Sequence, residues 1–398
     1  MKPSRIALCL ALLAACSAPA PAPLPPEPAA PPPPATASAA PPLSASASAV
    51  PAMAAAVPKM PPGWPYTAPA AGVASTRGMV SSDEQLATKV GQEMLAAGGN
   101  AVDAAVATAF ALAVVLPSAG NIGGGGFMVA RVGDKTHALD FREKAPSKAK
   151  ADMFLGKDGK PTPDSRSGYL ASGVPGSVAG LFEAHKKLGS RSKSWKDVMA
   201  PAIKLARDGF TVDDNFARVV SDSTEKLQKY PASAALFLPG GKPPAAGTVF
   251  KNPDLAATLE RIADQGPAGF YAGKTAELLV AEMKRGKGLI SAADLKAYQA
   301  KWREPIEFSY RGRKVLSMPP PSSGGVTLGI MCGLLEGFDI GKRPFQSPEH
   351  LQPVFEAMRR AFAARNATLG DPDVVKNPVE QLLSKAWLDQ QRASITPG

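Results

Sequence analysis

A long stretch rich in proline, alanine and serine decides how much of this chain can fold. Residues 17–71 hold 18 of the 41 prolines in the 398-residue sequence, and Ala and Ser make up most of the rest. Such a segment has too few apolar side chains to bury a core, so it stays extended and solvated. We therefore expect a disordered tether here, with a proline-rich docking ligand as the alternative, and a folded region formed by residues 72–398.

The segment before the tether has the layout of an export signal. A basic start precedes the apolar run 6–15, which is shorter than the roughly 20 residues that a membrane-spanning helix needs. The run leads through Leu-Ala-Ala into Cys16, which resembles a bacterial lipobox. We expect residues 1–16 to be a lipoprotein-type signal with Cys16 lipidated, the alternative being an ordinary signal peptide. Because Ser17 and not Asp follows, we expect an exported protein with a lipid anchor in the cell envelope, on the periplasmic side of the outer membrane.

The folded region carries a formal charge of +9, because the chain's +11 includes two cations of the signal. This charge could attract anionic substrates, yet the basic residues are scattered and form no aromatic-interleaved stripe, so we expect no nucleic-acid partner. Cys332 is the one cysteine of the folded region, in an apolar helical context that predicts a buried structural thiol. The histidines are His137, His185 and His350, and their wide spacing leads us to expect no metal site; we expect no cofactor either.

Hydrophobic periodicity and capping residues predict an α+β fold with segregated helices. The stretch 101–116, capped by Asn100, is apolar on nearly every face and should form a buried core helix. Pro353 could delay the start of the helix around it. Helices are expected at 83–97, 101–116, 176–188, 195–208, 213–229, 253–264, 274–285, 292–301, 326–335, 348–367 and 378–393. Strands are expected at 78–82, 127–132, 136–141, 306–310 and 314–317.

Four consecutive glycines, 123–126, lie between the buried helix and the first strand of a hairpin. A dinucleotide-binding loop needs Gly-x-Gly-x-x-Gly between a strand and a helix, and a P-loop needs a lysine where Phe127 stands, so both nucleotide sites are excluded. A tight core corner or the wall of a substrate pocket remains. Arg142, just after the hairpin, offers a bidentate donor for a carboxylate, the alternative being a surface arginine paired with Glu143 or Asp140.

Several motifs resemble the γ-glutamyltranspeptidase (glutathione hydrolase) family and follow one another in the family's order. They are GGNAVDA at 98–104, AGNIGGGGF at 119–127, DFRE at 140–143 followed by Ala145-Pro146, ASGVPG at 171–176, PPPSSGG at 319–325 and LGDP at 369–372. The resemblance implies an N-terminal nucleophile (Ntn) hydrolase. We therefore expect part of a four-layer αββα sandwich, with the C-terminal half of the sandwich missing from this chain.

The resemblance also implies a chemistry. A precursor of this family cuts itself into a large and a small subunit and frees an N-terminal threonine, whose own amine acts as the base. The threonine attacks the amide carbonyl of a γ-glutamyl compound such as glutathione, and the γ-glutamyl group then passes to water or to an amino acid. Arg142 matches the family arginine that binds the α-carboxylate of the γ-glutamyl group. The glycine run is then expected to serve mainly as packing beneath the site.

The family's nucleophile opens the small subunit, whereas this sequence ends at Thr396-Pro397-Gly398. Two residues after Thr396 cannot form the strand that a freed threonine must begin, and the family's Thr-Thr-His-x-Ser junction is absent. Ser322 and Ser323 belong to a large-subunit motif and are not the family's active-site serine pair. We therefore expect a large-subunit portion, truncated before the cleavage junction, with no catalytic residue of its own and inactive without a C-terminal small subunit as partner.

Two alternatives stay open. One is a related Ntn amidase, such as a cephalosporin or glutaryl acylase or a poly-γ-glutamate depolymerase, because Arg142 favours γ-glutamyl substrates without excluding these. The other is a non-catalytic, truncated lipoprotein. In either case we expect the missing sheet strands to leave apolar edges exposed and to lower the solubility of the chain alone.

Overall fold

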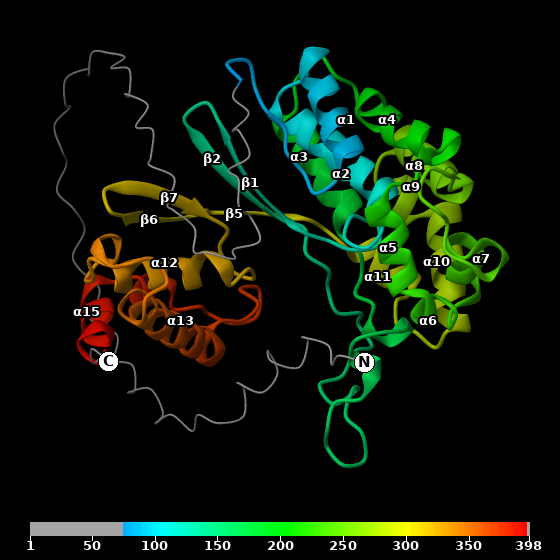
Figure 1. The fold of residues 1–398 in the computed structure, drawn as a ribbon. Helices are drawn as coiled ribbons and strands as arrows, with labels where there is room; N and C mark the ends of the chain where they lie inside the picture. The colour runs from blue at the N-terminus through cyan, green and yellow to red at the C-terminus, as the bar shows by residue number, and fades with distance from the viewer. Residues whose placement is uncertain (1–74, 396–398) are drawn as a thin grey trace, which may run out of the picture. The chain divides into compact units, whose positions relative to one another are not determined.

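The computed structural model describes residues 75–395, all but the first two of them in the compact unit Arg77–Gly398. The expected signal, the tether, Cys16 and Thr396 lie outside the described residues. The helices (Figure 1) are α1 (Gln85–Ala96), α2 (Ala101–Val115), α3 (Ser177–Leu188), α4 (Trp195–Asp208), α5 (Asp214–Asp222), α6 (Thr224–Leu227), α7 (Pro231–Phe237), α8 (Pro253–Gln265), α9 (Ala268–Tyr271), α10 (Gly273–Arg285), α11 (Ala292–Ala297), α12 (Gly324–Leu335), α13 (Pro348–Thr368), α14 (Val379–Leu382) and α15 (Lys385–Ala393).

Within residues 75–395 the strands form three small antiparallel sheets, so the fold there is a mixture of helix and sheet. They are β1 (Phe127–Val132), β2 (Lys135–Asp140), β3 (Phe210–Thr211), β4 (Val249–Phe250), β5 (Lys301–Arg303), β6 (Ile306–Tyr310) and β7 (Arg313–Ser317). β1 and β2 form the expected hairpin, and β5 joins the free edge of β2 with Ala138 opposite Arg303. β3 pairs with β4, and β6 with β7. The β2–β5 pairing matters for function, because it brings residues of the 300s beside the end of β2.

The expected buried helix is confirmed as α2. Asn100 accepts hydrogen bonds from the N–H groups of Val102 and Asp103, and the Asp103 carboxylate returns one to the N–H of Asn100, which is a complete capping box. α2 packs against α1, α3 and α4, and Phe110 at its centre has no exposed surface. A helix that is apolar on nearly all sides is stable when most of its surface is covered, and within α2 only Ala101 and Ala105 are exposed.

A second core forms around α12, which is also apolar on nearly all sides. The β6–β7 hairpin covers one side of α12, while α13, α14 and α15 cover others, as Figure 1 shows in yellow to red. Val326, Ile330 and Leu334 of α12 are fully buried in this cluster. The cluster carries the loop 319–323 and the end of α13, both of which take part in the site described below.

Several expected elements differ in the structure. The prediction of a strand at 78–82 is wrong, because no described strand pairs with this segment, which leads into α1 as a loop. The hydroxyl and the N–H of Ser82 instead form hydrogen bonds with the Thr88 side chain. Pro353 does not delay the start of α13. The Ser347 side chain caps the helix by accepting the N–H of His350, and Pro348 occupies the first helical position, where the missing N–H of a proline costs no hydrogen bond.

Two expected helices are divided and one is too long. The helix 213–229 breaks at Ser223 into α5 and α6, and the helix 378–393 breaks at Ser384, whose side chain caps α15. The helix 292–301 ends at Ala297, because Lys301 already belongs to β5 and its backbone pairs with β2. The short elements α7, α9, β3 and β4 were not expected. At Ser384 the side chain accepts a backbone hydrogen bond that starts the next helix, and at Lys301 a strand pairing distant in sequence ends the helical segment.

Candidate functional site

The glycine run lies directly behind the backbone of Arg142. Gly126 exchanges two hydrogen bonds with Phe141, of 3.2 and 3.0 Å, which extends the β1–β2 pairing by one residue pair. A Cβ atom on Gly125 would overlap the Phe141 carbonyl and lie 2.7 Å from the backbone nitrogen of Glu143. The run is therefore side-chain-free because the backbone of 141–143 passes through the space that side chains would occupy.

Further residues hold the same segment from the other side. Gly176 donates its N–H to the Gly124 carbonyl at 2.7 Å, and a Cβ on Gly176 would overlap both the Phe141 carbonyl and the hydroxyl of Tyr298. The Tyr298 hydroxyl donates to the Arg142 carbonyl at 2.8 Å. Burial raises the pKa of Tyr298, so this hydroxyl keeps its proton and remains a donor. The backbone of Arg142 is thus fixed on two sides.

The Arg142 side chain projects from this clamp into solvent. Its Nη1 donates to the carbonyl of Pro321 at 3.4 Å, and it makes no ion pair with any carboxylate between residues 75 and 395. The alternative expectation of an ion pair with Asp140 or Glu143 is wrong, since Asp140 is held by Arg303 and the Glu143 carboxylate lies beside Gly124. An exposed guanidinium on a fixed backbone is available for an anionic ligand.

Arg142 lines a pocket of about 380 Å³. Four sequence segments build it: the end of β2, residues 298–303 with β5, the loop 319–323, and the end of α13 with the residues after it. Its lining residues are Asp140, Arg142, Glu143, Lys144, Tyr298, Gln299, Lys301, Arg303, Pro320, Pro321, Ser322, Ser323, Arg365, Asn366, Leu369, Gly370, Asp371 and Asp373. Three of the motifs singled out in the sequence, DFRE, PPPSSGG and LGDP, therefore meet at one place.

An ion-pair network forms one wall of the pocket. Arg303 contacts Asp140 at 2.8 Å and Asp373 at 3.2 Å, and Lys301 contacts Asp373 at 2.7 Å. Hydrogen bonds from Lys301 and Arg303 lower the pKa of Asp373 to about 2, so this carboxylate is ionised at neutral pH. The two cations of this network, Lys301 and Arg303, balance its two carboxylates. Both carboxylates are therefore already paired and do not form an ion pair with Arg142.

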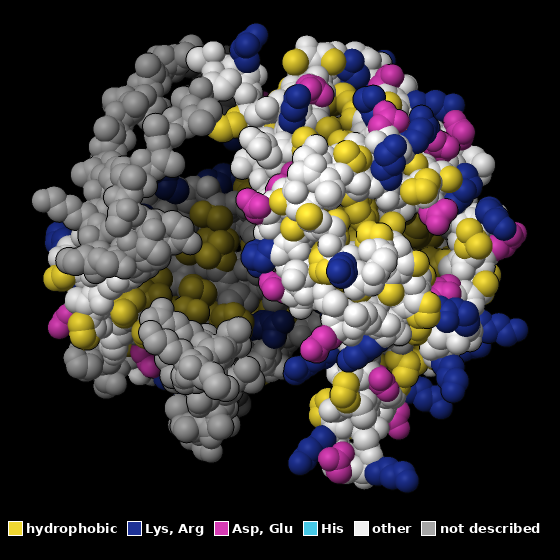
Figure 2. All heavy atoms as spheres, turned by 45° about the vertical axis from the view of Figure 1, so that its right-hand side comes forward, with side chains coloured by type: hydrophobic (Ala, Val, Ile, Leu, Met, Phe, Trp, Pro, Cys, Tyr) yellow, Lys and Arg dark blue, Asp and Glu magenta, His cyan; other side chains and the backbone are white. Residues whose placement is uncertain are grey.

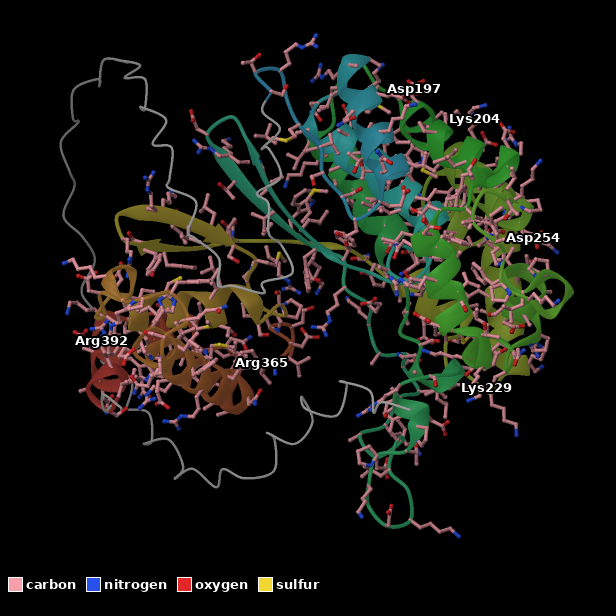
Figure 3. All side chains as sticks on the ribbon, in the orientation of Figure 1. Asp197, Lys204, Lys229, Asp254, Arg365 and Arg392 are labelled. Carbon is pink, nitrogen blue, oxygen red and sulfur yellow. The ribbon has the colours of Figure 1, made fainter. Side chains whose placement is uncertain are left out.

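Sequence reasoning found Arg142 but missed Arg365, Lys301, Arg303 and Asp373. The β2–β5 pairing places Lys301 and Arg303 beside the end of β2, and Asp373, which follows α13, joins them through ion pairs; no local pattern indicates either contact. Arg365 lies near the end of α13 and is labelled in Figure 3. Its position four residues before the LGDP motif was the one available signal.

Other expected features lie outside the pocket. Cys332 is half-buried in α12, and burial raises the pKa of its thiol. On the face shown in Figure 2, Lys and Arg side chains are interspersed with Asp and Glu and form no continuous stripe among the described residues. Within the part of the chain that the structure describes, no helix is both long enough and apolar enough to cross a membrane.

Known proteins are similar to this chain in sequence and in fold. The gamma-glutamyltranspeptidase family matches residues 87–398. The glutathione hydrolase proenzyme of Escherichia coli is 46% identical over 318 residues, which are 79% of this chain and 54% of that protein. The acylase ACY 1 proenzyme of Pseudomonas sp. (strain V22) is 41% identical over 336 residues, 82% of this chain and 59% of that protein.

A crystal structure of the γ-glutamyltranspeptidase of Helicobacter pylori superimposes with a TM-score of 0.80 at 43% identity, covering 82% of this chain and 94% of that one. The chain spans a little over half the length of the curated relatives it matches. The matched region nevertheless includes every motif that lines the pocket. The chain belongs to the γ-glutamyltranspeptidase family, a family of enzymes.

Proposed function

We propose that this chain is the large-subunit portion of a γ-glutamyltransferase/glutathione hydrolase and that Arg142 binds the α-carboxylate of the γ-glutamyl group. One observation carries the proposal: the Arg142 guanidinium stands without a carboxylate partner in the pocket where three family motifs meet. A planar guanidinium can hold a carboxylate through two parallel hydrogen bonds, which fixes the orientation of the ligand as well as its position.

In this proposal the chain positions the substrate and does not itself attack it. Arg142 anchors one end of the γ-glutamyl group, so that the scissile amide carbonyl comes to a fixed distance from the anchor. A threonine hydroxyl from a C-terminal small subunit adds to that carbonyl, the threonine amine takes the proton, and the amine product leaves with a proton. Water or an amino acid then releases the γ-glutamyl group. Within the sandwich expected for the family, the three small sheets would be completed by strands of that subunit.

The proposal includes export. We propose that residues 1–16 direct export, that Cys16 carries a lipid in the cell envelope and that residues 17–71 tether the folded region 72–398 to it. The test is mass spectrometry of the mature N-terminus in the native host. A lipid-modified Cys16 supports the anchor, and a different, unmodified N-terminus contradicts it. Cys16→Ala is expected to move the protein from the membrane fraction to the soluble fraction.

The activity is tested by joining this chain to the C-terminal segment of the Escherichia coli glutathione hydrolase proenzyme, 54% of which is covered by the similarity. We expect the fusion to cleave itself and to hydrolyse a γ-glutamyl anilide. We expect the 398-residue chain alone to hydrolyse none, because the attacking threonine comes from the added segment. Turnover by the chain alone, or a fusion that cleaves itself but leaves γ-glutamyl anilide intact, would contradict the proposal.

A second candidate function is that of a related amidase, because a protein named as an acylase is almost as similar to this chain as the glutathione hydrolase is. The self-cleaved fusion distinguishes the two. A γ-glutamyl anilide and a glutaryl anilide both carry a carboxylate for Arg142 at the same distance from the amide, and the glutaryl compound lacks only the α-amino group. Faster turnover of glutaryl anilide, or of poly-γ-glutamate, than of γ-glutamyl anilide and glutathione would favour the amidase.

A further inference from the structure

The pocket holds a second guanidinium, that of Arg365, which has no carboxylate partner among residues 75–395. Its Nε donates to the Ser323 hydroxyl at 3.0 Å and its Nη1 to the Asn366 side-chain oxygen at 2.7 Å. Both acceptors are neutral, so they orient the group without compensating its charge. A guanidinium has five N–H donors, and the described residues accept from only two of them.

Arg142 and Arg365 both contact the loop 319–323, although Arg142 precedes this loop in the sequence and Arg365 follows it. Arg142 contacts the carbonyl of Pro321, and Arg365 contacts the hydroxyl of Ser323. Two residues of extended chain span at most about 7 Å, so the two contact points are close together and Ser322 lies between them. The two uncompensated charges therefore flank one small region of the pocket.

No carboxylate of the pocket contacts either guanidinium of this pair in the part of the chain that the structure describes. Lys301, Arg303, Asp140 and Asp373 are engaged with one another, and the Lys144 ammonium lies 5.7 Å from the centre of the Tyr298 ring. The Asp371 carboxylate accepts the N–H of Asp373 at 2.9 Å and the Glu143 carboxylate lies beside Gly124; neither makes an ion pair in the described structure. Two adjacent cations repel each other, and a ligand with two carboxylates would remove that repulsion.

We propose that Arg365 forms a second carboxylate subsite, which makes the pocket selective for γ-glutamyl ligands that carry another carboxylate at the far end of a short chain. γ-Glutamyl peptides with a free C-terminus have this chemistry, whereas the corresponding amides do not. The first carboxylate is assigned to Arg142 by the proposed function, on which this inference rests. Arg365 is then a specificity-determining residue for the part of the substrate beyond the γ-glutamyl group.

The test compares two probes on the 398-residue chain by titration calorimetry: γ-glutamylglycine, with two carboxylates, and γ-glutamylglycinamide, with one. We expect γ-glutamylglycine to bind more tightly, and Arg365→Gln to weaken it about tenfold while leaving the amide unchanged, as loss of one charge-assisted hydrogen bond implies. Arg131→Gln is the matched control, because Arg131 is exposed in the β1–β2 hairpin and lies outside the pocket. Equal weakening of both probes, or no difference that depends on Arg365, overturns the subsite.

Turnover by the fusion separates this inference from the proposed function. If the fusion hydrolyses γ-glutamyl anilide and Arg365→Gln does not alter its preference for γ-glutamylglycine over the amide, the subsite is wrong and the function stands. If the self-cleaved fusion hydrolyses no γ-glutamyl compound, yet the chain prefers γ-glutamylglycine through Arg365, the function is wrong and the subsite stands.

Discussion

At the scale of single residues, the site depends on places where a side chain would not fit. The backbone of 141–143 runs between Gly125 and Gly126 on one side and Gly176 on the other, and the hydroxyl of Tyr298 holds it there. The position of the Arg142 guanidinium is therefore set by close backbone packing behind it.

This packing predicts unequal effects of two glycine substitutions. Gly176→Ala places a methyl group where Phe141 and Tyr298 already lie, and we expect it to lower the free energy of unfolding by about 1–3 kcal/mol. Gly123→Ala is the control, because a Cβ there meets nothing within 4 Å, and its effect should stay within about 0.5 kcal/mol. Denaturant unfolding of the two variants measures this. Equal stabilities would show that the Arg142 segment is not packed as described.

A second prediction concerns Arg142 itself. In the self-cleaved fusion, Arg142→Ala should lower kcat/KM for γ-glutamyl anilide by about 10- to 150-fold, since a hydrogen-bonded charged contact contributes about 1.5–3 kcal/mol. Arg131→Ala, in the exposed hairpin, should leave kcat/KM unchanged. An Arg142→Ala enzyme as active as the parent would remove the proposed role of this residue.

At the scale of elements, Asp103 joins two helices. Its carboxylate caps α2 by accepting the N–H of Asn100. It also contacts the end of α3, where it lies 3.0 Å from Nδ1 of His185, and the residues after α3, where it accepts the N–H of Ser190 at 3.0 Å. Burial raises the pKa of Asp103, but hydrogen bonds from Ser190, Asn100 and His185 outweigh burial and hold the pKa below its usual value. The ionised carboxylate thus stabilises the contact between α2 and the end of α3.

The lowered pKa of Asp103 determines how its contribution to the free energy of unfolding depends on pH. Because the carboxyl binds its proton less readily in the folded chain, its stabilisation is present above the unfolded pKa of about 3.9 and is lost as the pH falls through the folded pKa. Asp103→Asn should lower the free energy of unfolding by about 2 kcal/mol at pH 7, and this difference from the parent should shrink below pH ~4. Exposed Asp264 supplies the control, Asp264→Asn. A difference that stays constant from neutral pH to pH ~3 would contradict the assignment.

The elements also show what the sequence could and could not predict. α2 was predictable because its cap, its length and its apolar faces are all local features. β5 was not, since the predicted helix 292–301 runs into Lys301, and Lys301-Trp302-Arg303 forms a strand only by pairing with β2, more than 160 residues earlier. For the same reason Arg142 could be singled out from its own motif, whereas Arg365 could not be placed beside it. Local signals identify elements, and long-range pairing assembles the pocket.

At the scale of the whole molecule, the described chain leaves apolar surface exposed. Phe355, Met358 and Phe362 of α13 are exposed at helical spacing, so they form one stripe, and Val129 and Val132 of β1 are exposed as well. We expect the 398-residue chain alone to self-associate, with a mass in light scattering that rises with concentration, and the fusion to do so less. A monodisperse monomer at every concentration would contradict this expectation.

The central claim is that the Arg142 pocket holds the α-carboxylate of a γ-glutamyl group. The most direct measurement is a crystal structure of the self-cleaved fusion with bound L-glutamate. We predict that the α-carboxylate of glutamate accepts two hydrogen bonds of about 2.8 Å from the Arg142 guanidinium. Glutamate bound elsewhere, or with its α-carboxylate on Lys301 or Arg303 and Arg142 unengaged, would contradict the claim.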